Sequence, residues 1–248
     1  MVQEHKIVAI VQARMGSSRL PGKVAKEIVG KPMLAHLINR LKRAENLNQI
    51  VIATSKEKAD DRVVEIAKRE GVDFYRGSET DVLSRYIEAA QKFGADVIIR
   101  ITGDCPLIDP VTVDEVIADF LKSEVDYMGH RGYPRGLDTE VFYLETLLRV
   151  KELLSDDKKD DLYREHVTLY IYRHPEIFNI AHHQAPEVLR RDYRLCVDEI
   201  DDFRLVKEIY ERLYREDKVF DIKETIKLLD QEPELARLNS HVQQKKYI

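Results

Sequence analysis

The first half of the chain alternates short, almost wholly apolar runs with stretches in which apolar residues recur at helical spacing. The apolar runs predict four strands, at residues 6–12, 50–54, 72–75 and 95–102. The periodic stretches predict three helices, at residues 30–41, 60–70 and 79–93. Gly71 and Gly94 directly follow the last two helices, where a left-handed glycine commonly ends a helix. This alternation predicts a three-layer α/β fold on a mixed, mostly parallel sheet.

From about residue 124 the pattern becomes irregular. Further strands are expected at residues 125–129, 178–183 and 193–198, and further helices after residue 143, at residues 161–173 and at residues 201–215. The last of these strands would rejoin the parallel scheme, and the final 15 or so residues read as a polar tail. Because no repeat or linker-like tract divides the sequence, we expect a single domain over residues 1–248 with an inserted segment at about 130–190.

The segment after the first predicted strand concentrates small residues and fixed cations. It reads Q-A-R-M-G-S-S-R-L-P-G-K at residues 12–23. Its glycines let backbone N–H groups approach an anion, and Arg14, Arg19 and Lys23 would neutralise that anion, which predicts a loop that binds a nucleoside triphosphate. A Walker A loop is excluded because the two glycines are one residue too far apart, and a dinucleotide fingerprint because its second glycine is absent. A solvated basic turn is the alternative.

Two acidic residues that follow predicted strands are candidates for a metal site. Asp104 lies in the T-G-D-C-P segment after strand 95–102, and Asp198 ends the expected strand 193–198. Ligands of open α/β sheets bind at the carboxyl ends of strands, and carboxylates suit Mg²⁺ when substrate phosphates complete its coordination. The pattern therefore favours metal-assisted phosphoryl or nucleotidyl transfer. The alternative is that Asp104 caps the helix at Pro110 or stabilises a turn, and that Asp198 caps the helix near Ile200.

Composition narrows the range of partners. The net charge of −5 gives no argument for binding nucleic acid. No apolar stretch approaches the roughly 18 residues of a membrane span, and the first residues lack the apolar core of a signal peptide, so we expect no membrane insertion. Cys105 and Cys196 lie far apart with no C-x-x-C pair, which is typical of a protein in the reducing cytoplasm.

Seven segments together resemble the sugar-acid cytidylyltransferases. Four are similar to segments of that group, whose Kdo (3-deoxy-manno-octulosonate) enzymes share the first: G-S-S-R-L-P-G-K at 16–23, G-K-P-M-L-A-H at 30–36, I-V-I-A-T at 50–54 and G-D-C-P at 103–106. Three are more similar to the spore-coat polysaccharide (SpsF-type) branch: G-L-D-T-E-V-F at 136–142, R-E-H-V-T-L-Y-I-Y at 164–172 and V-D-E-I-D-D-F at 197–203. The resemblance implies a Rossmann-like nucleotidyltransferase fold of GT-A type, CTP as substrate and a homodimer.

The resemblance also assigns roles to individual residues. It implies that the nucleotide is bound by Gln12, Ala13, Arg14, Gly16, Ser17, Arg19, Lys23, Arg76 and Thr102. It implies that Asp104 and Asp198 bind Mg²⁺. Catalysis is expected to depend on three of these residues: Arg19, Lys23 and Asp104. The implied reaction transfers CMP from CTP to a hydroxyl of an acidic sugar in surface polysaccharide biosynthesis and releases pyrophosphate.

Three other functions stay open as alternatives. Thr102 and Cys105 stand where the Kdo enzyme has Gln and Glu, so the substrates could be another nucleoside triphosphate or a sugar phosphate. A GT-A glycosyltransferase shares the architecture, although its D-x-D motif is not evident here because Cys105 and Pro106 follow Asp104. The third alternative is an inactive nucleotide-binding partner of a polysaccharide assembly complex.

The acceptor sugar is expected to contact the irregular segment. Arg131, Tyr133 and Arg135 lie in the loop H-R-G-Y-P-R-G, whose arginines suit a sugar carboxylate; a solvated or dimer-contacting loop is the alternative. Glu165 and His166 are further acceptor candidates on a helix that also has packing positions.

The histidine pair and the aromatic residues of this segment have other expected roles. His182 and His183 lack a third metal ligand at suitable spacing and are interpreted as strand or surface residues. Four aromatic residues of the inserted segment are expected at a dimer interface: Tyr163, Tyr170, Tyr172 and Phe178.

Overall fold

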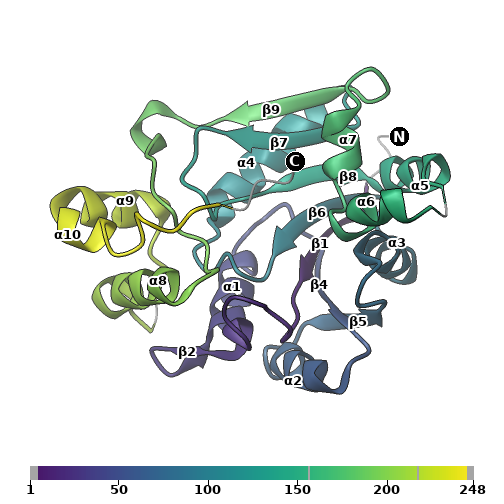
Figure 1. Ribbon diagram of the computed structural model, residues 1–248. Helices are drawn as coiled ribbons and strands as arrows, with labels where there is room; N and C mark the ends of the chain where they lie inside the picture. Colours follow the sequence, from purple (N-terminus) through teal and green to yellow (C-terminus); the bar gives the residue numbers. More distant parts are fainter. Residues whose placement is uncertain (1–4, 156, 217, 245–248) are drawn as a thin grey trace.

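The computed structural model describes residues 5–155, 157–216 and 218–244, and within these ranges a seven-stranded sheet forms the centre of the molecule (Figure 1). The strand order is β5-β4-β1-β6-β8-β7-β9. The strands are β1 (Ile7–Gln12), β4 (Gln49–Ser55), β5 (Asp73–Gly77), β6 (Val97–Thr102), β7 (Tyr127–Arg131), β8 (Glu140–Tyr143) and β9 (Ile180–Gln184). Strand β8 is antiparallel to β6 and β7, and the other pairings are parallel. The expected mixed, mostly parallel sheet is confirmed.

Apolar residues cover both faces of the sheet and make it the middle of three layers. In β1, Val8 and Ile10 enter one core and Ala9 and Val11 enter the other, and all four are fully buried. One face packs against α1 (Met33–Leu41), α2 (Asp61–Arg69), α4 (Pro110–Lys122), α8 (Ile200–Leu213) and α9 (Ile222–Gln231). The other packs against α3 (Val82–Phe93), α5 (Leu144–Leu153) and α7 (Leu169–Arg173). Among the described residues, no helix is long and apolar enough to cross a membrane.

The remaining elements are short. They are β2 (Glu27–Ile28), β3 (Lys31–Pro32), α6 (Asp161–Glu165), α10 (Pro233–Ala236) and the 3₁₀ turns Lys23–Ala25, Lys58–Asp60, Lys158–Asp160 and Glu187–Leu189. Strands β2 and β3 pair with each other, so the first helix begins at Met33 rather than at residue 30. The stops at Gly71 and Gly94 are as expected, because both glycines have left-handed backbone.

Three predictions for the second half of the chain are wrong. Residues 193–198 form an extended loop rather than a strand, because their hydrogen bonds go to other loops: Leu195 N–H donates to Arg135 and Val197 N–H to Asp104. The helix at 161–173 is broken at residues 166–168 into α6 and α7.

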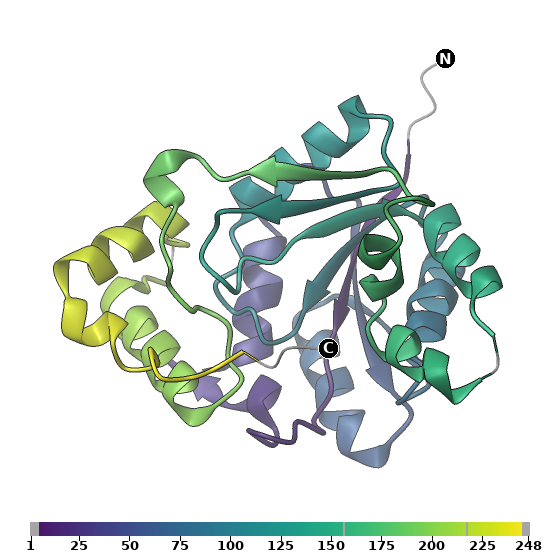
Figure 2. The same ribbon diagram turned by 45° about the horizontal axis from the view of Figure 1, so that its top comes forward.

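The third error concerns the polar tail. Its described part, up to residue 244, includes the end of α10 and folds against α8 and α9, with Leu235 and Asn239 buried. The rest of that tail, residues 245–248, lies outside the described residues. Figure 2 shows the described part, up to residue 244, running from α10 back toward the middle of the molecule.

The segment 130–190 supplies part of the main sheet. Strands β8 and β9 lie within it and pair with β6 and β7. Phe178, expected at a dimer interface, is instead buried in the core beneath α3 and α5, so its aromatic surface is used within the subunit. Tyr163 and Tyr170 pack edge to face, with ring centroids 5.1 Å apart, whereas Tyr172 is 46% exposed.

Replacing Gly136 by alanine tests whether the loop at 193–198 is held by close backbone contact. Gly136 has φ +99°, and an added Cβ would lie 2.4 Å from the nitrogen of Cys196, a backbone atom that cannot rotate away. Gly94 is the matched control, because it has φ +64° and nothing within 4 Å of an added Cβ. In urea denaturation we expect Gly94→Ala to lose roughly 1–2 kcal/mol of unfolding free energy and Gly136→Ala clearly more. Equal losses would contradict the close contact.

Candidate functional site

A cavity of about 610 Å³ opens at the carboxyl ends of β1 and β6. Gln12 and Thr102, the last residues of these two strands, are paired in register, so the loops that follow leave the sheet at the same level. Gly103 lets them touch: its N–H donates to the carbonyl of Gln12 at 2.8 Å, and an added Cβ would lie 2.9 Å from the side chain of Ala13. The sheet therefore delivers two chemistry-bearing loops to one opening, as expected for an open α/β sheet.

The loop at residues 12–23, called the Gly/Arg loop below, forms one wall of the cavity. Ser17 and Gly22 donate their backbone N–H groups to the carbonyl of Met15, each at 2.9 Å, which folds the loop into a compact turn. Asp60, 2% exposed, anchors it by accepting from the backbone N–H of Met15 at 2.7 Å and from Ser55. Burial opposes ionisation of Asp60, but these hydrogen bonds outweigh it and lower its pKa. The loop is thus fixed, with small residues and cations facing the cavity.

The side chains of Asp104 and Asp198 meet at a single cation, the ammonium of Lys23. Lys23 Nζ donates to Asp104 Oδ2 at 2.8 Å, to Asp198 Oδ1 at 3.1 Å and to the carbonyl of Val197 at 2.6 Å. Lys23 is 9% exposed; burial lowers its pKa, but the two carboxylates outweigh this and raise it. Neither Asp caps a helix: Asp109 caps α4, and Glu199 with Asp202 forms the capping box of α8. The helix-capping alternative is therefore excluded.

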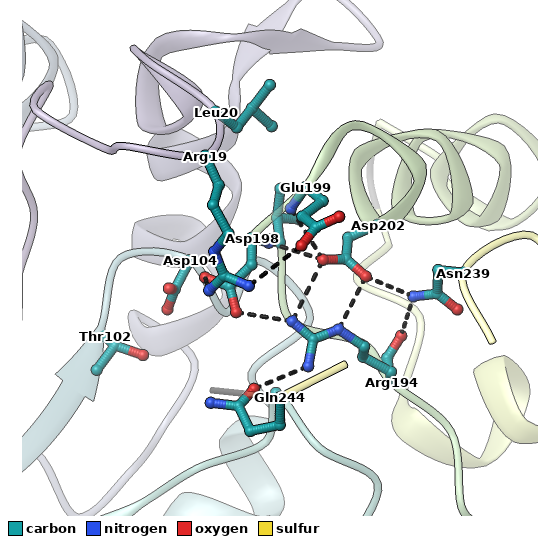
Figure 3. Close-up of polar contacts among 12 residues, drawn as sticks. Arg19, Leu20, Thr102, Asp104, Arg194, Asp198, Glu199, Asp202, Asn239 and Gln244 are labelled. Carbon is teal, nitrogen blue, oxygen red and sulfur yellow. Dashed lines mark hydrogen bonds and ion pairs between the residues drawn. The ribbon is translucent and has the colours of Figure 1, made fainter. Parts of the chain in front are cut away.

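Asp198 is surrounded by cations from three parts of the chain. Besides Lys23, Arg19 Nη2 lies 3.0 Å from Oδ1, and Arg194 Nη2 donates to Oδ2 at 2.7 Å (Figure 3). Burial raises the pKa of Asp198, but Lys23, Arg19 and Arg194 together outweigh it and lower the pKa. Asp198 is therefore an ionised group at neutral pH, although it sits on a loop and not at the end of a strand as expected.

The two carboxylates have the donor chemistry for Mg²⁺. Among the described residues, no cluster of three or more His, Cys, Asp or Glu is arranged to hold a metal ion. Mg²⁺ is commonly held by only one or two carboxylates, with substrate phosphates and water completing its coordination. Asp104 and Asp198 fit that pattern, because one oxygen of each already faces the same positive charge.

A buried ion pair between strands β6 and β8 also lines the cavity. Arg100 and Glu140 are bonded to each other, and Glu140 also accepts from Tyr127 Oη at 2.6 Å and Thr168 Oγ1 at 3.0 Å. Burial raises the pKa of Glu140, but Arg100 and the two hydroxyls outweigh it and lower the pKa. His130 lines the cavity as well, and its Nδ1 is buried with no hydrogen-bond partner among the described residues.

Comparison with known proteins identifies the family. The cytidylyltransferase family model matches residues 8–245. The chain belongs to the cytidylyltransferase family. This cytidylyltransferase is 34% identical over 235 residues to the spore coat polysaccharide biosynthesis protein SpsF of Bacillus subtilis, covering 93% of this chain and 96% of that protein. The resemblance to the SpsF-type branch is confirmed.

Two solved structures share the fold of this cytidylyltransferase. A cytidylyltransferase from Leptospira borgpetersenii serovar Hardjo-bovis has a TM-score of 0.87 and 30% identity, covering 98% of this chain and 100% of that one. A CMP-2-keto-3-deoxy-manno-octonic acid synthetase complexed with CTP has a TM-score of 0.65 and 19% identity, covering 84% of this chain and 100% of that one. The expected nucleotidyltransferase fold is confirmed.

Most residues that the sequence indicated line the cavity of this cytidylyltransferase. They are Gln12, Ala13, Arg14, Gly16, Ser17, Arg19, Lys23, Thr102, Asp104, Arg135, Glu165, His166 and Asp198. Arg76, Arg131 and Tyr133 do not line it. Arg76 lies on β5, which β4 separates from β1, and it is bonded to Ser55, Glu57 and Asp61. Tyr133 is buried and hydrogen-bonded to His183, and Arg131 is exposed at the end of β7.

Two functional residues that sequence reasoning missed carry signals in the sequence. Arg100 is the one charge within the apolar run V-I-I-R-I at residues 97–101, a pattern that could have indicated a buried partner. Glu140 lies inside a segment already noted for its resemblance. Cys105 and Cys196 line the cavity as well, but burial raises the pKa of both thiols, to about 12 for Cys196, so they are poor nucleophiles.

Glu140→Gln tests whether the Arg100–Glu140 pair stabilises this cytidylyltransferase. Removing one partner of a buried ion pair costs about 3–5 kcal/mol because the other charge stays buried. The folded-state pKa of Glu140 is lowered, so its contribution is complete above the ordinary glutamate pKa and is lost as pH falls through the folded value. We expect a large difference in unfolding free energy at about pH 7 that shrinks below about pH 4. Asp230→Asn, which breaks the exposed pair with Arg191, is the control and should cost much less, because water screens an exposed pair. Equal costs for the two variants would contradict this assignment.

Proposed function

We propose that this cytidylyltransferase transfers CMP from CTP to a hydroxyl of an acidic sugar, of nonulosonic or octulosonic type, for surface polysaccharide biosynthesis. The observation that carries the proposal is the convergence of Asp104 and Asp198 on one cation beside the Gly/Arg loop. The CTP-bound neighbour of the same fold and the similarity to SpsF support this choice. A homodimer acting in the cytoplasm, with the exposed Tyr172 near its interface, is part of the proposal.

In this proposal the nucleotide's phosphates lie along the Gly/Arg loop. Arg14 and Arg19 neutralise the triphosphate, and the small side chains of residues 16–18 allow the phosphates to approach the loop closely. Mg²⁺ held by Asp104 and Asp198 would supply Lewis acidity to the α-phosphate. Lys23 turns from the carboxylates toward the phosphates, so its charge stays within the site and assists the departing pyrophosphate.

The acceptor occupies the part of the cavity lined by His130, His166 and His182, and Arg135 also lines the cavity. Burial lowers the pKa of His130, His166 and His182, so these imidazoles are neutral at neutral pH and act as hydrogen-bonding groups. Arg135 is exposed and forms no ion pair with any described residue, so its guanidinium is free to bind an anion. One unpaired arginine beside neutral histidines matches one carboxylate better than a doubly charged sugar phosphate.

Pyrophosphate release tests the reaction and the metal ligands. Purified protein with Mg²⁺ should release pyrophosphate from CTP, rather than UTP, GTP or ATP, only when an acidic sugar is present. Asp104→Ala should slow the reaction roughly 10²–10³-fold or more without unfolding the protein, because charge on the α-phosphate is no longer neutralised. Asp73→Ala, at an exposed position on β5, is the control and should keep normal turnover. Release with another triphosphate or with a sugar phosphate alone would refute the proposed substrates.

Lys23→Met tests whether the ammonium and the metal ion compete for the same two carboxylates. Without nucleotide, wild-type protein should bind Mn²⁺ weakly, because Lys23 already neutralises Asp104 and Asp198. The variant should bind Mn²⁺ more tightly without CTP yet turn over CTP more slowly. The loss of the free Mn²⁺ resonance signal measures binding, and Lys26→Met, outside the cavity lining, is the control. Identical Mn²⁺ binding by wild type and Lys23→Met would refute the assignment of these carboxylates.

A further inference from the structure

Asp198 lies on a loop, and a buried carboxylate fixes that loop. Asp202 is fully buried, and its Oδ2 accepts from the backbone N–H groups of Asp198 and Glu199 at 2.9 and 3.0 Å. Its Oδ1 accepts from Arg194 Nε at 2.9 Å and from Asn239 Nδ2 at 2.8 Å. Asp202 therefore ties the backbone of the metal-binding loop to an arginine and to the C-terminal segment after α10.

Arg194 orients the carboxylate of Asp198 directly. Its Nη2 donates to Asp198 Oδ2 at 2.7 Å (Figure 3), and Asp198 Oδ1 accepts from Lys23 at 3.1 Å. A guanidinium holds a fixed plane, so its direction depends on what its other nitrogens bind. Nε is bound by Asp202, and Nη1 donates to Gln244 Oε1 at 2.9 Å.

The C-terminal segment completes this arrangement with two uncharged side chains. Asn239, 2% exposed, donates from Nδ2 to the carbonyl of Arg194 at 2.9 Å as well as to Asp202. Gln244 bonds the far side of the guanidinium and also lines the cavity. Both residues come from a part of the chain about 45 to 50 positions away from Arg194.

We propose that Arg194, Asp202, Asn239 and Gln244 are positioning residues that set the orientation of Asp198 toward the metal ion, which makes the C-terminal segment part of the active site. This inference rests on the proposed function, because it concerns the metal ligand assigned there. Groups that orient a metal ligand typically change metal affinity or activity by 10–100-fold when removed. Asn239 and Gln244 are the informative positions, since their removal changes geometry without changing the charge around Asp198.

The test compares Asn239→Ala and Gln244→Ala with Gln243→Ala, an exposed glutamine next to Gln244. Mn²⁺ affinity is measured by the free-ion resonance signal in the presence of CTP, and kcat and KM by pyrophosphate release. We expect both variants to bind Mn²⁺ about 10-fold more weakly and to lose kcat in proportion, with KM for the acidic sugar unchanged. Excess Mn²⁺ should restore kcat, which it would not do if the variants were merely damaged.

Gln244→Glu keeps an acceptor atom for Arg194 Nη1, so it should not weaken Mn²⁺ binding as Gln244→Ala does. If Asn239→Ala unfolds because Asn239 is buried, the comparison of Gln244→Ala with Gln244→Glu still decides the question. Suppose that the wild-type protein binds Mn²⁺ in a CTP-dependent way and that Gln244→Ala binds it equally tightly. That result would overturn this inference and leave the proposed function standing. Absence of CTP-dependent Mn²⁺ binding in the wild-type protein would overturn the proposed function and this inference with it.

Discussion

The ammonium of Lys23 lies within hydrogen-bond distance of two carboxylates and a carbonyl oxygen, and the rest of the site is organised around this contact. Asp104 and Asp198 carry like charges, so they can approach one point only if a cation lies between them. The three groups come from three loops: the Gly/Arg loop, the loop after β6 and the loop before α8. Electrostatic attraction therefore holds these three loops together, and it places the two carboxylates where the proposed Mg²⁺ ion would contact both.

The sheet makes that contact possible by setting the level of the loops. Parallel pairing of β1 with β6 brings Gln12 and Thr102 side by side, and Gly103 allows the two following loops to touch. The loop before α8 has no strand to align it. It is held instead by the backbone bond from Val197 to Asp104 and by the buried carboxylate of Asp202. The sheet therefore positions the Gly/Arg loop and the loop after β6, whereas side chains and one backbone bond position the loop before α8.

This division explains how much the sequence could predict. The part positioned by the sheet can be predicted from local patterns. An apolar run predicts a strand, the loop after β1 is recognised by its glycines and arginines, and Asp104 lies just after β6. Asp198 is indicated by its place at the end of an apolar run, but the strand expected there is wrong, because the buried residues 195–197 pack here as part of a loop. The sequence carries no signal for the contact between Arg194 and Asn239. A hydrogen bond between residues about 45 positions apart leaves no periodic pattern in the sequence. Arg76 does not line the cavity, because it lies on β5, which β4 separates from β1.

The charged groups that line the cavity differ in how they are balanced, and under the proposed function this difference bears on specificity. Asp198 has three cations within hydrogen-bond distance, so a triphosphate would meet positive charge that can be redistributed from the carboxylates. Arg100 is instead neutralised by Glu140, and the histidines stay neutral because burial lowers their pKa. Arg135 forms no ion pair with any described residue, so its charge would be available to the proposed acceptor. A single carboxylate would match that charge, whereas a second negative charge would lie in a cavity that Glu140 and Glu165 also line.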